Sequence, residues 1–223
     1  MKSSTETAGA VPLTRELEIT VEASRRGYRL FAPLYDVVFG LTLHHGRRLA
    51  IAALDCCAGE RVLEVCVGSG LSLPLYPEHV HVTGVDISQE MLSKAARRVR
   101  SRRNPQNTVL LPSDVEHMAF ADASFDKAVV LYAMAGLPDP VRAMKEIERV
   151  CRPGATIVIA NHFRSVRPLQ RVCDALLSPI YRLLRYRADL DLHSFVDAAR
   201  LDVLEMRPAN LFGYSTVLVC RKA

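Results

Sequence analysis

From residue 61 onward, short apolar runs typical of β-strands alternate with stretches in which apolar residues recur at helical spacing. The strand-like runs are RVLEVC, VHVTGVD, NTVLLPSD, FDKAVVLYA, GATIVIANHF, LDVLEMRP and YSTVLVCRK. The helical stretches lie near 88–103, 139–151 and 167–199. This alternation predicts an α/β fold with a Rossmann-like, doubly wound sheet, which binds its ligands outside the carboxyl ends of the central strands.

The last two strand-like runs are joined by about six residues that include Pro208, Asn210 and Gly213. A connection this short cannot contain the helix that a parallel crossover needs. The sequence therefore predicts a seven-stranded sheet whose last strand is antiparallel.

Three regions are expected along the chain. Residues 1–13 are small and polar, which favours a flexible N-terminus, and 14–57 have a helical pattern interrupted at Pro33. We interpret 14–57 as N-terminal helices that cap the ligand site expected at the carboxyl ends of the strands and that contact a membrane. Residues 58–223 form the main domain, with a basic amphipathic insertion over 164–199.

Composition excludes several classes of protein. No apolar run is long enough to span a membrane, and the N-terminus has polar residues where a signal peptide needs an apolar block, so we expect a cytoplasmic protein. The cysteines contain no C-x-x-C pair, so neither a metal site nor a disulfide framework is expected. They are Cys56, Cys57, Cys66, Cys151, Cys173 and Cys220.

The segment VLEVCVGSGLSLPLY (62–76) places a glycine turn directly after a strand-like run. A dinucleotide fingerprint would need glycine at Cys66, Gly68 and Leu71, and only Gly68 fits. The spacing instead resembles the first motif of class I S-adenosylmethionine-dependent methyltransferases, an acid followed by Gly-x-Gly-x-Gly. Glu64, Gly68 and Gly70 match that motif, whereas Cys66 replaces a family glycine.

Two further acids follow the next two strand-like runs. Asp86 ends VTGVD, and a carboxylate there can accept both hydroxyls of a ribose. The resemblance implies that Asp114, in LLPSDVE, accepts the adenine amine. It also implies S-adenosyl-L-methionine as cofactor and S-adenosyl-L-homocysteine as product. The residues expected to contact the cofactor are Tyr35, Glu64, Val65, Gly68, Ser69, Gly70, Leu71, Asp86, Ile87, Met91, Asp114, Val115 and Tyr132.

The fourth strand-like run ends in Tyr132-Ala133-Met134-Ala135. Methyltransferases that act on base amines or on glutamine usually have Asn/Asp-Pro-Pro-Tyr/Phe here, so this ending disfavours both substrates. The chain also lacks a basic strip interleaved with aromatic residues, so no nucleic-acid partner is expected. A small molecule or a lipid is the predicted acceptor.

YRLFAPLYDVVFG (28–40), VTGVDISQEML (82–92) and RPGATIVIANHF (152–163), together with the glycine turn, resemble the soluble bacterial phospholipid N-methyltransferases. That family converts phosphatidylethanolamine to its methylated derivatives and phosphatidylcholine. The resemblance covers roughly residues 25–165. Quinone C-methyltransferases share the first three features more loosely and usually lack the Asn-His-Phe step.

An ethanolamine nitrogen, like a lysine amine with a pKa of about 10.4, must lose a proton before it can attack a methyl group. We expect His162 and the hydroxyls of Tyr28 and Tyr35 to accept or relay that proton, with Asn161 as a second polar group at the same strand end. A histidine satisfied by backbone groups and a packed Tyr35 are the structural alternatives.

Residues 164–187 form a basic amphipathic segment with a single acid. Such a segment is typical of binding to an anionic membrane surface, here the inner face of the cell membrane, although a helix with a solvated arginine face gives the same pattern. The residues expected to contact substrate or membrane are Arg164, Arg167, Arg171, Tyr181, Arg182, Arg185 and Arg187.

Two other functions remain open from the sequence. One is a methyltransferase for a quinone or another small acceptor. The other is a non-catalytic subunit that binds S-adenosylmethionine. Cys66 in place of a family glycine favours this reading. It would, however, leave Asn161, His162 and the two tyrosines without a common function.

Overall fold

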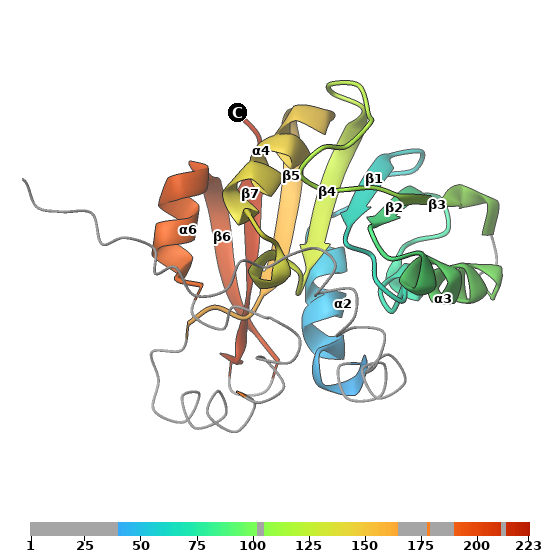
Figure 1. Ribbon diagram of the computed structural model, residues 1–223, viewed down its shortest axis with the longest axis horizontal. Helices are drawn as coiled ribbons and strands as arrows, with labels where there is room; N and C mark the ends of the chain where they lie inside the picture. Colours follow the sequence, from blue (N-terminus) through green and yellow to red (C-terminus); the bar gives the residue numbers. More distant parts are fainter. Residues whose placement is uncertain (1–39, 102–104, 165–177, 179–189, 211–212) are drawn as a thin grey trace, which may run out of the picture.

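The computed structural model describes residues 40–101, 105–164, 178, 190–210 and 213–223. A seven-stranded sheet with the order β3-β2-β1-β4-β5-β7-β6 forms its centre (Figure 1). Its strands are β1 (Arg61–Val65), β2 (His81–Asp86), β3 (Thr108–Pro112), β4 (Phe125–Leu131), β5 (Cys151–Asn161), β6 (Asp202–Ala209) and β7 (Ser215–Arg221). The α-helices are α2 (His44–Ala53), α3 (Gln89–Arg100), α4 (Pro140–Val150) and α6 (Leu192–Ala199).

Strands β1 to β5 pair in parallel, and β7 pairs antiparallel with both β5 and β6. The predicted α/β fold with an antiparallel last strand is therefore confirmed. β6 ends at Ala209, one residue beyond the run LDVLEMRP, so Pro208 belongs to the strand and not to the connection. A proline is tolerated there because β6 is an edge strand, so one side of its backbone needs no ladder hydrogen bond.

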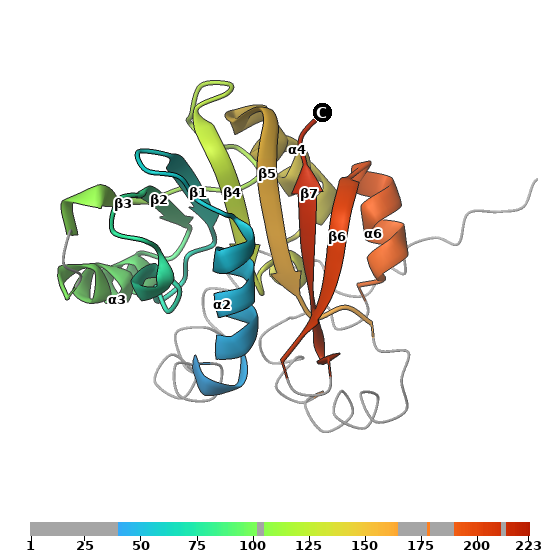
Figure 2. The same ribbon diagram turned by 180° about the vertical axis from the view of Figure 1, so that it is seen from behind.

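Helices cover both faces of the sheet and bury two separate apolar clusters. On one face, α4 and α6 pack Met144, Ile147 and Phe195 against the sheet. On the other face, seen in Figure 2, α2 and α3 contribute Ile51 and Leu92. The central strands are consequently buried on both sides, as their continuous apolar runs require.

The ends of α3 and α4 follow from local sequence. The hydroxyl of Ser88 accepts the N–H of Met91 at 3.3 Å and caps α3, and the Asp139 carboxylate accepts the N–H of Arg142 at 2.9 Å and caps α4. Such caps satisfy N–H groups that have no partner inside the helix. α3 begins shortly after β2, and α4 follows β4 after the short helical turn Met134–Gly136.

Several sequence expectations fall on residues outside the described ranges. These are the flexible N-terminus, the helices expected over 14–39, and most of the basic segment, namely 165–177 and 179–189. The expected N-terminal helical region ends in α2, and the expected insertion ends in α6. Among the described helices, none has the length and apolar character needed to cross a lipid bilayer.

Candidate active site at the carboxyl edge of the sheet

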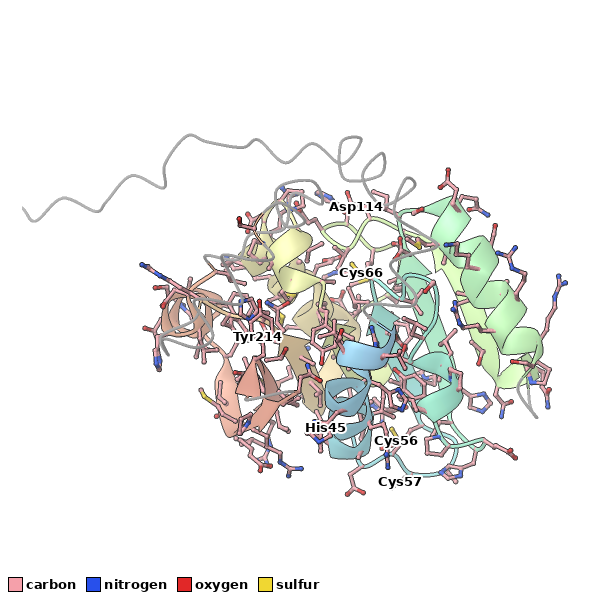
Figure 3. The ribbon with its side chains drawn as sticks, turned by 90° about the horizontal axis from the view of Figure 1, so that it is seen from below. His45, Cys56, Cys57, Cys66, Asp114 and Tyr214 are labelled. Atoms are coloured by element: carbon pink, nitrogen blue, oxygen red, sulfur yellow. The ribbon has the colours of Figure 1, made fainter. Side chains whose placement is uncertain are left out.

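The parallel strands of the sheet all end at one edge, onto which Figure 3 looks. Cys66 follows β1, Asp86 ends β2, Tyr132 follows β4 and His162 follows β5. Ligands of doubly wound sheets bind beyond this edge, beside the point where the strand order reverses, which here lies between β1 and β4.

The glycine turn contains three residues with left-handed backbone conformation, Cys66 at φ 54°, Gly68 at φ 55° and Gly70 at φ 78°. A Cβ on Gly70 would lie 2.9 Å from the Cβ of Ala95, so glycine lets the turn pack against α3. A Cβ on Gly68 would come no nearer to another group than 3.9 Å, from the carbonyl of Cys66. Gly68 therefore leaves a space in which a ligand can approach the backbone.

The carboxylate of Asp86 is part of this turn. Its Oδ2 accepts the backbone N–H of Gly68 at 2.8 Å, and its Oδ1 accepts that of Ser88 at 2.9 Å. The two bonds hold the carboxylate in one orientation between the glycine turn and the start of α3.

Glu64 holds the other side of the turn. Its side chain is buried and accepts the hydroxyl of Tyr76 at 2.8 Å and the hydroxyl of Ser72. Because both donors follow the turn in sequence, Glu64 ties the segment after the glycines back to β1. A direct contact between Glu64 and the cofactor stays a prediction. Sequence reasoning did not identify Ser72 and Tyr76 as partners of Glu64. The pattern that could have indicated them is two hydroxyl residues shortly after an acid in a buried strand.

Asp114 lies in the loop after β3 and is exposed, and its Oδ1 accepts the N–H of Glu116 at 2.9 Å. The same loop is anchored to α4 by Arg149, which donates to the carbonyls of Phe120 at 2.9 Å and Met118 at 3.0 Å. The loop that presents Asp114 is thus attached to a helix at several points.

Cys66, Asp86 and Asp114 lie near one another, as Figure 3 shows for Cys66 and Asp114. Burial raises the pKa of the Cys66 thiol, and the charges of the two carboxylates raise it further. Carboxylates around a glycine turn suit a ligand with hydroxyl and amine donors, since they would repel a phosphate. The site therefore fits an adenosine that carries no phosphate.

His162 and Asn161 are both buried at the end of β5. The Nδ1 atom of His162 lies 2.6 Å from the carbonyl oxygen of Tyr214, and its ring stacks on the Tyr214 ring with centroids 4.1 Å apart. The Asn161 side-chain amide donates to the carbonyl of His162 at 2.6 Å. Tyr214 was not identified from the sequence.

Tyr132 turns its hydroxyl toward α2. That hydroxyl accepts the side-chain amide of Asn210 at 3.0 Å, and the guanidinium of Arg47 lies 5.5 Å from the ring centroid. Burial raises the pKa of Tyr132, an effect that the hydrogen bond from Asn210 opposes. The Oδ1 atom of Asn210 also accepts the N–H of Gly46 at 2.9 Å, so these residues join α2 to the sheet edge. The predicted contact of Tyr132 with a cofactor stays a prediction.

The other predicted cofactor contacts lie at this edge or beneath it. The buried ones are Val65, Ser69, Met91 and Val115, and the half-buried ones are Leu71 and Ile87. Arg164 is exposed, and its backbone N–H donates to the carbonyl of Leu190 at 2.9 Å. The predicted residues outside the described ranges are Tyr28, Tyr35, Arg167, Arg171, Tyr181, Arg182, Arg185 and Arg187.

Known proteins resemble this chain in both sequence and fold. The methyltransferase domain family matches residues 63–159. The phosphatidylethanolamine N-methyltransferase of Cereibacter sphaeroides is 37% identical over 199 residues, which cover 89% of this chain and 97% of that protein. The demethylmenaquinone methyltransferase of Paenarthrobacter aurescens is 33% identical over 63% of this chain, and the match spans 55% of that protein.

Solved structures give the same assignment for the fold. A methyltransferase from Aquifex aeolicus whose activity depends on S-adenosylmethionine superimposes with a TM-score of 0.62 at 16% identity. The superposition covers 90% of this chain and 98% of that one. In the sheet of this chain the antiparallel strand β7 lies next to last, between β5 and β6. The fold is therefore the one that such a methyltransferase has.

Proposed function

Because this chain belongs to the S-adenosylmethionine-dependent methyltransferases, we propose that it methylates the amine of phosphatidylethanolamine and of its mono- and dimethylated products, toward phosphatidylcholine. The observation that carries this proposal is the near full-length similarity to the Cereibacter sphaeroides protein, of which 97% is matched. The match to the demethylmenaquinone methyltransferase of Paenarthrobacter aurescens spans little more than half of that protein.

When bound, S-adenosyl-L-methionine would supply a methyl group on a positively charged sulfur. A nucleophilic amine would accept that methyl group, and S-adenosyl-L-homocysteine would be the leaving group. In our proposal Asp86 accepts the ribose hydroxyls, and Asp114 and Val115 bind the adenine. The open space beside Gly68 supports a close approach to the backbone of the turn. Glu64 keeps that turn in place through Ser72 and Tyr76.

The acceptor amine must be deprotonated before it attacks, because an ammonium has no lone pair. We assign proton acceptance to His162, supported by its position directly after β5, at the same carboxyl edge of the sheet as Asp86 and the glycine turn. Alignment of the amine with the methyl group then supplies much of the acceleration, on the order of 7–11 kcal/mol in favourable intramolecular cases. Tyr28 and Tyr35 remain proposed contributors from the N-terminal region.

The lipid tails of such a substrate stay in a bilayer, so the protein has to act at a membrane surface. The basic amphipathic segment 164–187 supports this, since its arginines suit lipid phosphates and its leucines and tyrosines suit the acyl boundary. We propose that this segment attaches the protein peripherally to an anionic membrane.

A quinone acceptor is the second candidate. It is favoured by the similarity to demethylmenaquinone methyltransferases and to the 2-phytyl-1,4-naphtoquinone methyltransferase of Synechococcus elongatus, which is 32% identical over 63% of this chain. A carbon acceptor would need no ammonium deprotonation, so the two candidates make different demands on His162.

The experiment that tests the proposal follows labelled methyl from S-adenosylmethionine into vesicles of phosphatidylethanolamine and phosphatidylglycerol, with the products separated by chromatography. Mono-, di- or trimethylated lipid supports the proposal, and absence of labelled lipid with intact cofactor binding contradicts it. A variant with Arg182→Glu, Arg185→Glu and Arg187→Glu should lose sedimentation with these vesicles. Unchanged sedimentation would contradict the membrane role of the segment.

A further inference from the structure

We propose that Tyr214 is a positioning residue for His162, and that it fixes both the ring plane and the tautomer so that Nε2 is the nitrogen that accepts the proton. The catalytic part of this inference rests on the proposed function. The tautomer and the ring plane of His162 do not, because they concern contacts between two residues of this protein in the absence of any substrate.

Sheet register brings the two residues together although they are 52 positions apart. β5 and β7 run antiparallel with Asn161 opposite Thr216. His162 is the first residue after β5, and Tyr214 is the last residue before β7. The end of one strand and the start of the other therefore present these side chains to each other at the carboxyl edge.

The hydrogen bond determines which nitrogen carries the proton. A backbone carbonyl oxygen can only accept, so at 2.6 Å from the Tyr214 oxygen the Nδ1 atom of His162 must be the donor. In a neutral imidazole one nitrogen carries hydrogen and the other a lone pair. Nε2 is then the nitrogen with the lone pair, and a general base needs that lone pair.

The ring contact fixes the remaining freedom of the imidazole. The rings of His162 and Tyr214 are 4.1 Å apart with an angle of 12° between their planes. A tilt of the imidazole would break this stack, and a half-turn of the ring would replace Nδ1 by a carbon and lose the hydrogen bond. Tyr214 thus opposes both motions of the imidazole. Its backbone carbonyl opposes the half-turn, and its ring opposes the tilt.

Tyr214 is itself held by the turn between β6 and β7. The side-chain amide of Asn210 donates to the hydroxyl of Ser215 at 3.0 Å, and the N–H of Gly213 donates to the carbonyl of Asn210 at 3.2 Å. Ser215 also pairs with Ala209 in the β6–β7 ladder. The residues on both sides of Tyr214 are therefore fixed, and its carbonyl has a defined position.

Nitrogen-15 NMR of the histidine side chains tests the tautomer directly. The protein has seven histidines, and the signals of His162 are identified by their loss in His162→Gln. We expect a protonated Nδ1 and a lone-pair Nε2 in the wild type and in Tyr214→Phe, which keeps the aromatic stack. Tyr214→Ala keeps the backbone carbonyl and loses only the ring, so we expect Nδ1 to stay protonated while the signals broaden, because the imidazole is no longer held in one plane. A wild-type Nε2–H tautomer, or an unchanged spectrum in Tyr214→Ala, would overturn the inference.

Kinetics test the catalytic part. Tyr214→Ala should lower kcat by about ten- to hundredfold, the size of effect expected when a catalytic group is misplaced. The KM for S-adenosylmethionine should stay within about twofold, and Tyr214→Phe should restore kcat. Tyr214→Leu, which keeps apolar volume without a flat ring, should behave like Tyr214→Ala and guards against a folding defect in the smaller variant.

The outcomes separate the two proposals. If the wild type transfers no methyl group to lipid while the NMR result holds, the proposed function fails and the role of Tyr214 in orienting His162 stands. If the wild type methylates phosphatidylethanolamine and Tyr214→Ala and Tyr214→Leu both keep its kcat, the positioning role fails and the proposed function stands.

Discussion

The carboxylate of Asp86 accepts the backbone N–H of Gly68 at 2.8 Å, across eighteen positions of sequence. One residue ends β2 and the other lies in the turn after β1, so the bond joins two strand ends. The second carboxylate oxygen accepts the N–H of Ser88, which caps α3. The glycine turn, the acid and the helix start are consequently joined by hydrogen bonds at the candidate site.

Asp86→Asn should weaken binding of S-adenosylmethionine by about five- to hundredfold, as expected for a loss of about 1–3 kcal/mol. The amide has one acceptor oxygen, so its nitrogen must face one of the two backbone N–H donors that the carboxylate accepts. Isothermal titration calorimetry measures the change. Asp202→Asn, an exposed acid at the start of β6, is the matched control and should bind normally. Equal affinities for the two variants would contradict the assigned role of Asp86.

Glu64→Gln should lower the free energy of unfolding by about 1–3 kcal/mol, because the amide leaves the hydroxyl of Ser72 or of Tyr76 without an acceptor. Tyr76→Phe should lower it less, and the double variant should lose less than the sum of the two single losses. Urea denaturation of all four proteins gives the coupling. Strict additivity would mean that the bond between Glu64 and Tyr76 contributes nothing to stability.

Cys66→Gly should raise the free energy of unfolding by up to about 1 kcal/mol. A non-glycine residue at φ 54° is strained, although glycine also increases the freedom of the unfolded chain and offsets part of the gain. Ala123→Gly is the control, since Ala123 has the same φ of 54° in an exposed turn away from the site. Both variants should shift the urea midpoint upward, and a downward shift for Cys66→Gly alone would show that the thiol packing outweighs the backbone strain.

Two glutamates on α4 should respond oppositely to pH. A hydrogen bond from Arg149 holds the pKa of Glu146 below its ordinary value, and burial raises that of Glu148. Ionised Glu146 therefore stabilises the fold above its unfolded-state pKa of about 4.3, and this is lost as pH falls through the lower folded value. For Glu148 the charged form is the unfavourable one, so it weakens the fold as pH rises.

At pH 7, Glu146→Gln should consequently lower the free energy of unfolding and Glu148→Gln should raise it. Both differences should shrink as the pH falls toward about 3, because the two glutamates become progressively protonated. Urea denaturation between pH 3 and pH 7 measures them. A difference of the same sign for both variants would contradict the assigned causes of the two pKa shifts.

Much of the fold is visible in the sequence because strands buried on both faces are continuous apolar runs. Each of the seven runs overlaps an observed strand, and the short link before YSTVLVCRK correctly predicted the antiparallel pairing. Asp86 and Asp114 were predicted as site residues for the same reason, since the ends of neighbouring parallel strands meet at one edge.

The contacts of His162, Tyr132 and Glu64 could not be predicted in the same way. His162 meets Tyr214 only because β7 inserts between β5 and β6, an order that strand patterns do not specify. Tyr132 meets Gly46 and Asn210 because α2 packs across the edge, and no periodicity encodes which residues touch there.

The most direct test of the phospholipid assignment is a competition within one vesicle population. Vesicles that contain equal amounts of phosphatidylethanolamine and a demethylated menaquinone are incubated with the wild-type protein and methyl-labelled S-adenosylmethionine, and the label in each product is counted. We predict label in methylated phosphatidylethanolamine and background counts in the quinone, with the lipid signal lost in His162→Gln. Label in the quinone and none in the phospholipid would contradict the assignment.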